Sequence, residues 1–208
     1  MNRDQAAWQA QSLLVGYPDG LAGHLPMLHC LTASLDSAVA APMSRFLDHA
    51  ESTPESELAA DYVATFDHRK RCCLFLTYYA YGDTRKRGIA LLAIKRKYAA
   101  AGLALSGDEL PDHLAVMLEY AATVRPDLGT MMLTAHRAGV ELLRLALHEC
   151  GSPWAYVLDS ISATLPPLRG DQRAAAARLA AEGPPEEQVG LAPFGPPEYM
   201  PATQGAQR

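Results

Sequence analysis

The sequence of 208 residues lacks any long hydrophobic run. No stretch approaches the ~20 consecutive apolar residues that cross a bilayer. The first ten residues also hold no apolar run that would serve as a secretion signal. We therefore expect a cytoplasmic protein that does not insert directly into a membrane.

Cysteine is scarce, and its spacing excludes two roles. The four cysteines, Cys30, Cys72, Cys73 and Cys150, include no CxxC pair, and two of them are adjacent. This spacing fits neither a zinc site nor a disulfide framework. Cys72 has two interpretations: a reactive thiol whose pKa nearby cations such as Arg69 would lower, or a small core residue. We favour the core residue.

Catalytic signatures are missing as well. The sequence contains no GxGxxG, P-loop, GxSxG or HExxH motif and no cluster with metal-ligand spacing. Asp112 and His113 are the best candidate acid–base pair, but neighbouring residues on a helix point in different directions. We predict instead that Asp112 lies in the first turn of a helix and that His113 is partly buried. We expect no enzyme, no cofactor and no metal.

Charge is distributed unevenly along this acidic chain, whose net charge is −5 and whose pI is about 5.8. Residues 67–97 hold nine of the 18 basic residues and two acidic ones, so this basic segment carries +7 and the remainder −12. Either an anionic partner or a solvated helix face explains such asymmetry, and we favour the solvated face. No nucleic-acid-binding motif is present, so we expect no nucleic-acid partner.

Helical periodicity and helix-end signals follow one another along the chain. A helix is predicted from Pro54 to Phe66, with Ser52 and Thr53 as its cap. A second is predicted after Asp83, closed by Gly102, and a third after Asp108. The inward residues expected in the second and third helices are Leu91, Ile94, Tyr98, Leu114, Met117, Leu118 and Ala121.

Two more helices are predicted further along the chain. A long one runs from Pro126, a favourable first residue, to Gly151. Ser152 and Pro153 begin the next one. Its inward residues are Trp154, Val157, Leu158, Ile161 and Leu165.

The run CCLFLTYYAY, residues 72–81, is apolar or aromatic at nine of ten positions. A strand would need a partner, and no other run alternates in the required way. We predict a helix that is hydrophobic on most sides and central to the core.

The composition changes near the C-terminus, where residues 183–208 contain six prolines and four glycines. Such a segment buries too little apolar surface to offset the cost of ordering it. The sequence thus predicts one all-α helical bundle, residues 4–182, followed by a flexible tail, residues 183–208. We expect a monomer or a weak homodimer.

Several motifs between residues 61 and 103 carry a family resemblance when taken together. They are YVATFD, LFLTYY, GDTRKRG and a leucine-rich stretch ending in KRKYAAAGL. ELPDHLAVMLEYAA at 109–122 and SLLVGYPD at 12–19 match two further elements. This ordered set resembles the NarJ-type assembly chaperones of respiratory nitrate reductase, within the TorD/DmsD family of redox-enzyme maturation proteins.

The resemblance implies a cytoplasmic, all-helical, non-enzymatic chaperone. Such a protein binds the N-terminal segment of the catalytic (alpha) subunit and assists molybdenum cofactor insertion before membrane attachment. The resemblance also implies that proteins of molybdenum cofactor biosynthesis are partners. An amphipathic peptide would lie in a groove between helices, with polar residues fixing its register.

The matching motifs also imply which residues bind the client peptide. We assign Phe66, Leu74 and Leu76 to the core. The client-binding candidates are Tyr62, Asp67, Arg69, Tyr78, Tyr79, Asp83, Arg85, Arg87, Asp112 and His113.

Two alternatives stay open at the level of sequence. One is a maturation chaperone for another molybdenum oxidoreductase. The other is a nucleotide-binding protein that places the basic segment, between residues 69 and 97, on phosphates, with strong salt dependence.

The tail yields the first testable prediction. Removing residues 183–208 should leave the melting temperature unchanged, because a segment of this composition adds little buried apolar surface. Thermal unfolding of the full and shortened chains, followed by circular dichroism, measures this. A large drop in melting temperature would show that the tail belongs to the fold.

Overall fold

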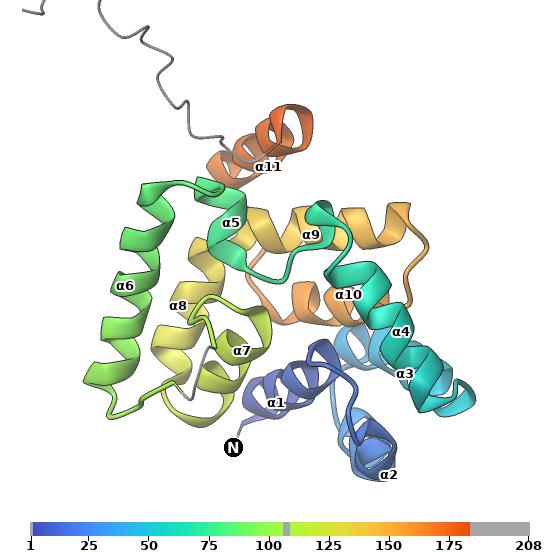
Figure 1. Ribbon diagram of the computed structural model, residues 1–208. Helices are drawn as coiled ribbons and strands as arrows, with labels where there is room; N and C mark the ends of the chain where they lie inside the picture. The colour runs from blue at the N-terminus through green and yellow to red at the C-terminus, as the bar shows by residue number, and fades with distance from the viewer. Residues whose placement is uncertain (1, 106–108, 184–208) are drawn as a thin grey trace, which may run out of the picture.

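The computed structural model describes residues 2–105 and 109–183 (Figure 1). Within these ranges the regular elements are all helices, and no strand is present. The predicted fold class is therefore confirmed. The Asp108 cap and the tail beyond Gly183 lie outside the described residues. In chain order the elements are α1 (Arg3–Val15), α2 (Leu21–Thr32), α3 (Ser37–Ser52), α4 (Glu55–Phe66), the 3-10 turn η1 (Lys70–Cys72), α5 (Leu76–Tyr81), α6 (Arg85–Ala100), α7 (Leu114–Thr123), α8 (Pro126–Ala135), α9 (Arg137–Glu149), α10 (Trp154–Thr164) and α11 (Gly170–Glu182).

The centre of the core is the Trp154 indole at the start of α10. It is fully buried and lies 5.5 Å, between ring centroids, from each of Phe46, Tyr62 and Phe66. Its Nε1 donates a hydrogen bond to the Leu14 carbonyl at 3.1 Å. This one side chain therefore joins α1, α3, α4 and α10, and the inward face predicted for α10 is confirmed.

The helices pack around α10 and α9 (Figure 1). Helix α10 packs against α1, α3 and α9, and α1 packs against α7. Helix α9 also contacts α5, η1 and α11, whereas α6 leans on α5 at one edge of the molecule. Within residues 2–105 and 109–183, none of the helices is both long and apolar enough to cross a membrane.

Two predicted caps are wrong. Helix α4 begins at Glu55, and the hydroxyls of Ser52 and Thr53 instead donate to the His49 carbonyl at 3.0 and 2.7 Å, where they close α3. Helix α6 follows Thr84 rather than Asp83.

The long helix predicted from 126 to 151 is two helices. It breaks at His136, whose backbone angles (φ −100°, ψ 16°) are not helical. The break lets α8 pack on α7 while α9 packs on α10. Gly151 ends α9 at a φ of +68°, a left-handed value that favours glycine.

The run 72–81 is helical only in its second half. The backbone N–H of Leu76 donates to the Asp112 carbonyl at 3.0 Å, and that of Leu114 donates to the Leu74 carbonyl at 2.9 Å. These bonds form an isolated antiparallel bridge, Phe75 with His113, which keeps the first half of the run extended. Asp112 therefore precedes α7 instead of occupying its first turn, which corrects that prediction.

Helices α7 and α8 approach each other closely at Gly129. A Cβ at this position would lie 2.3 Å from the Ala121 Cβ. We expect Gly129→Ala to destabilise the protein by about 2–3 kcal/mol through overpacking. Gly88→Ala on α6 is the matched control, since a Cβ there meets no heavy atom within 4 Å; it should stabilise by about 0.5–1 kcal/mol. Urea unfolding measures both changes, and equal effects would contradict the close approach.

Candidate functional site

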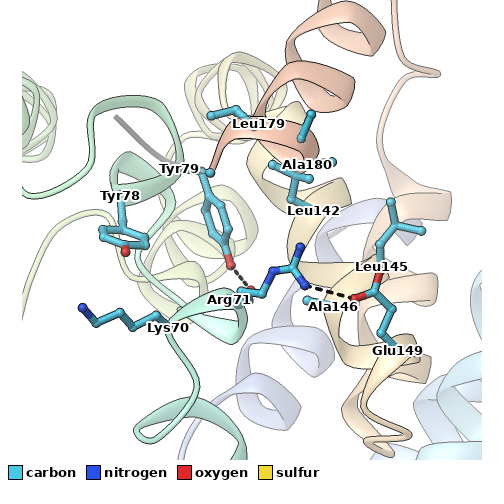
Figure 2. A pocket seen from close by; sticks show the side chains of 12 residues that line it. Lys70, Arg71, Tyr78, Tyr79, Leu142, Leu145, Ala146, Glu149, Leu179 and Ala180 are labelled. Atoms are coloured by element: carbon cyan, nitrogen blue, oxygen red, sulfur yellow. Dashed lines mark hydrogen bonds and ion pairs between the residues drawn. The ribbon is translucent and has the colours of Figure 1, made fainter. Parts of the chain in front are cut away.

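A groove of about 270 Å³ opens between η1, α5, α9 and α11 (Figure 2). One wall comes from η1 and α5, and the other from α9 and α11. The lining residues are Lys70, Arg71, Tyr78, Tyr79, Leu142, Leu145, Ala146, Glu149, Leu179, Ala180, Ala181 and Gly183.

The apolar part of the groove comes mainly from α9 and α11. Helix α9 carries two apolar faces: Val140, Leu143 and Leu147 are fully buried in the core, whereas Leu142 and Leu145 line the groove. Leu145 is 42% exposed, so a large apolar side chain faces solvent at the groove. Concave apolar surface of this kind marks a binding site more often than a structural one.

The aromatic part of the groove is held rigidly by Tyr79. Its hydroxyl is a donor within reach of the Arg71 and Cys73 carbonyls, at 3.0 and 2.9 Å. Its ring packs onto α9 at Gly139, where a Cβ would lie 3.1 Å from the ring. Burial raises the pKa of Tyr79 well above its usual value, so the hydroxyl stays protonated. Tyr78 stands beside it at the groove, half-buried.

Charged side chains form one end of the groove. Arg71 and Glu149 face each other across it with 3.5 Å between Nη1 and Oε2 (Figure 2). Both are largely exposed, at 75% and 67%. An exposed pair of this length contributes little free energy, so it can separate at small cost.

The buried carboxylate of Asp112 holds the first turn of α5 in place. Asp112 has no exposed surface, and its Oδ2 accepts hydrogen bonds from both the backbone N–H and the hydroxyl of Thr77, in the first turn of α5. His113 is half-buried beside it, with its ring 5.3 Å from the Phe75 ring. Burial lowers the pKa of His113, which favours the neutral imidazole.

The structure brings only part of the predicted client-binding set to the groove. Tyr78 and Tyr79 line it, and Arg69 is exposed immediately before η1. Asp112 and His113 lie under α5, in the bridge described above. Whether any of these residues contacts a client stays a prediction.

The remaining predicted residues lie elsewhere. Arg87 and Asp83 pair with each other at 2.9 Å, and the Arg87 guanidinium lies 6.0 Å from the centre of the Tyr78 ring. Arg85 is exposed on α6. Tyr62 is a core residue whose hydroxyl donates to the Val15 carbonyl, and Asp67 is exposed at the end of α4.

Sequence reasoning missed most of the groove. It named Lys70 only as a cation of the basic segment, and it assigned no role to the outer face of α9 or to α11. A signal was present on α9, since Leu142 and Leu145 fall outside the core-facing stripe of Val140, Leu143 and Leu147. Eight of the nine cations of the basic segment are exposed and Arg87 is partly so, in agreement with a solvated face.

Cys72 is a buried core residue, as favoured from the sequence. Burial, together with the neighbouring Cys150, raises the pKa of its thiol to about 12, and the nearby arginines offset this only in part. Cys72 on its own is therefore not an activated nucleophile. In the described ranges, no group of three or more His, Cys, Asp or Glu side chains is placed to hold a metal ion.

Fold and groove together define an all-helical protein with an aromatic and apolar groove between short helices. The sequence profile of the family described as "Nitrate reductase delta subunit" matches residues 32–159. The chain belongs to this family, which confirms the resemblance found in the sequence.

Individual relatives agree with the family. The chain is 36% identical over 157 residues to the nitrate reductase-like protein NarX of Mycobacterium tuberculosis, covering 76% of this chain but only 24% of that protein. It is 30% identical over 163 residues to a probable nitrate reductase molybdenum cofactor assembly chaperone, NarJ of Bacillus subtilis, covering 77% and 89%. NarJ of Escherichia coli is 30% identical over 152 residues, covering 71% and 64%. The chain thus spans about a quarter of the NarX length and most of the Bacillus protein.

The support beneath α5 gives a testable prediction. We expect Asp112→Ala to destabilise the protein by about 2 kcal/mol, because it leaves the buried donors of Thr77 unpaired. Asp83→Ala, which removes a carboxylate that is 76% exposed, is the control and should change stability by less than about 0.5 kcal/mol. Urea unfolding compares the two. Equal stability of the Asp112 variant and the parent would show that the buried hydrogen bonds contribute nothing net.

Proposed function

We propose that this chain is an assembly chaperone of respiratory nitrate reductase. In this proposal it binds the N-terminal segment of the catalytic (alpha) subunit in the groove between α5, α9 and α11. It holds that subunit while molybdenum cofactor is inserted and before the complex attaches to the membrane. The protein performs no catalysis of its own.

The groove is the observation that carries the proposal. Leu142, Leu145 and Leu179 offer an apolar surface to one face of an amphipathic helix, and Tyr78 and Tyr79 add aromatic area. Lys70, Arg71 and Glu149 at one end supply the polar contacts that would fix register. The choice of client is supported by the names of two relatives: a nitrate reductase molybdenum cofactor assembly chaperone in Escherichia coli and a probable one in Bacillus subtilis.

The size of the groove suggests how a client would engage it. Sites that enclose a small molecule measure roughly 300–1,000 Å³, so about 270 Å³ admits one or two anchoring side chains of a peptide. A longer stretch of peptide enters only if the wall of η1 and α5 moves away from α9. Transient binding suits a chaperone, because the client must leave once it is mature.

No observation favours the nucleotide alternative. The cations of the basic segment divide between η1 and the two ends of α6. Arg85 and Arg96 are eleven residues apart on one helix, which separates their Cα atoms by about 16 Å. They do not converge as a phosphate site requires.

The decisive experiment is calorimetric titration of the protein with a peptide copying the N-terminal segment of the catalytic subunit, at two salt concentrations. We expect saturable one-to-one binding. Leu145→Glu should raise the Kd about tenfold or more, since it puts a carboxylate on the apolar wall that α9 contributes to the groove. Met131→Glu is the matched control: Met131 is 52% exposed on α8, outside the groove, and the Kd should not change.

Two outcomes would count against the proposal. A folded protein that does not bind the peptide would point to another molybdenum oxidoreductase as client. Equal loss of affinity in both variants would place the binding surface elsewhere. Charge reversal at Arg85 extends the test, because an unchanged Kd would exclude that residue of α6 from the client surface.

A further inference from the structure

Two cysteines that are far apart in the sequence meet at the charged end of the groove. Cys72 is the last residue of η1, and Cys150 follows the last residue of α9. Helix α9 packs against η1, and the Cys150 side chain is near enough to raise the pKa of the Cys72 thiol through its charge and hydrogen bonding. The Cys150 Sγ itself donates to the Leu147 carbonyl at 3.4 Å. Cysteines at neighbouring positions on two packed elements are candidates for a disulfide without large backbone movement.

The residues next to this pair line the groove. Arg71 precedes Cys72 and Glu149 precedes Cys150, and these two neighbours form the weak ion pair across the groove. The Tyr79 hydroxyl is within hydrogen-bonding distance of the Arg71 and Cys73 carbonyls, on both sides of Cys72. A bond between the two cysteines would therefore act directly on both walls.

We infer that Cys72 and Cys150 are a reversible oxidation site whose disulfide fastens η1 to α9 and keeps the groove from widening. In the reduced protein, an exposed ion pair joins Arg71 to Glu149 across the groove, and it separates at little cost. In the oxidised protein a covalent bond replaces that weak link. Because a longer stretch of peptide enters only when the walls part, oxidation weakens client binding; this consequence rests on the proposed function.

The oxidant is a small-molecule disulfide, which reacts with the two cysteines by thiol–disulfide exchange. The Cys150 thiolate, at the partly exposed position, attacks one sulfur of the oxidant. This forms a mixed disulfide and releases one small thiol. Cys72 then loses its proton and displaces the second small thiol. Two protein thiols are oxidised to one disulfide, and one small disulfide is reduced to two thiols.

The order of these steps follows from the surroundings of the two sulfurs. Cys72 is buried and its thiol pKa is raised to about 12, so it is a poor first nucleophile. Within the mixed disulfide it is held next to its target, and proximity offsets its low thiolate fraction. Cys73, the adjacent residue, is half-buried and its thiol pKa is also raised by burial. It is the natural control.

The test incubates the full chain with oxidised glutathione and then measures intact mass, the linked peptides and client binding. We expect a loss of two hydrogen atoms, a peptide joining Cys72 to Cys150, a higher melting temperature and about tenfold weaker binding of the client peptide. Dithiothreitol should reverse all four changes. The double variant Cys30→Ser with Cys73→Ser should behave like the parent, whereas the same variant with Cys150→Ser added should form no internal disulfide.

Separate results would overturn the inference and the proposed function. Four free thiols after incubation, or a disulfide through Cys73, would overturn the oxidation site. A Cys72–Cys150 disulfide that leaves peptide affinity unchanged would overturn its action on the groove. If the reduced chain does not bind the peptide, the proposed function fails, and the mass and melting temperature still decide the oxidation site.

Discussion

The hydrogen bonds between Asp112 and Thr77 are the constraint on which the groove depends. Helix α5 has only six residues, too few to be stable by itself. The buried Asp112 carboxylate satisfies the N–H of Thr77 in its first turn, and the bridge between Phe75 and His113 fixes the segment that enters it. Tyr78 and Tyr79 directly follow Thr77, so the hydrogen bonds from Thr77 to Asp112, a residue distant in the sequence, fix their position at the groove.

The second constraint is the double role of α9. A helix that faces solvent on one side needs one apolar stripe, but α9 has a stripe toward α10 and another toward the groove. The absence of a side chain at Gly139 lets the Tyr79 ring lie against α9. Helix α11 covers only part of the outer stripe and leaves Leu145 open. The groove is thus the part of a helix–helix contact that residues 2–105 and 109–183 leave unfilled.

Local patterns in the sequence were enough to predict the all-α fold and much of its core. The stripe from Trp154 to Leu165 and the stripe from Leu114 to Ala121 are buried as their helical spacing indicates. The break at His136 was not predictable in this way, because neither glycine nor proline marks it. The pairing of Asp112 with Thr77 joins residues 35 positions apart, and no local signal announces such a contact. Motif resemblance found the two groove tyrosines, but it could not separate them from Asp112, which is buried beneath them.

The motifs that carry the family resemblance and the residues that line the groove overlap only in part. A binding groove made of short elements requires side chains that hold those elements, and such side chains need not touch the ligand. Arg87, near the ring of Tyr78 and paired with Asp83, and Asp112, beneath α5, are placed for this supporting task. The open apolar surface comes instead from leucines of α9 and α11, residues that any helix can contain. Specificity for a client would then reside in the shape that the supporting residues impose, and affinity in the leucines and tyrosines that they arrange.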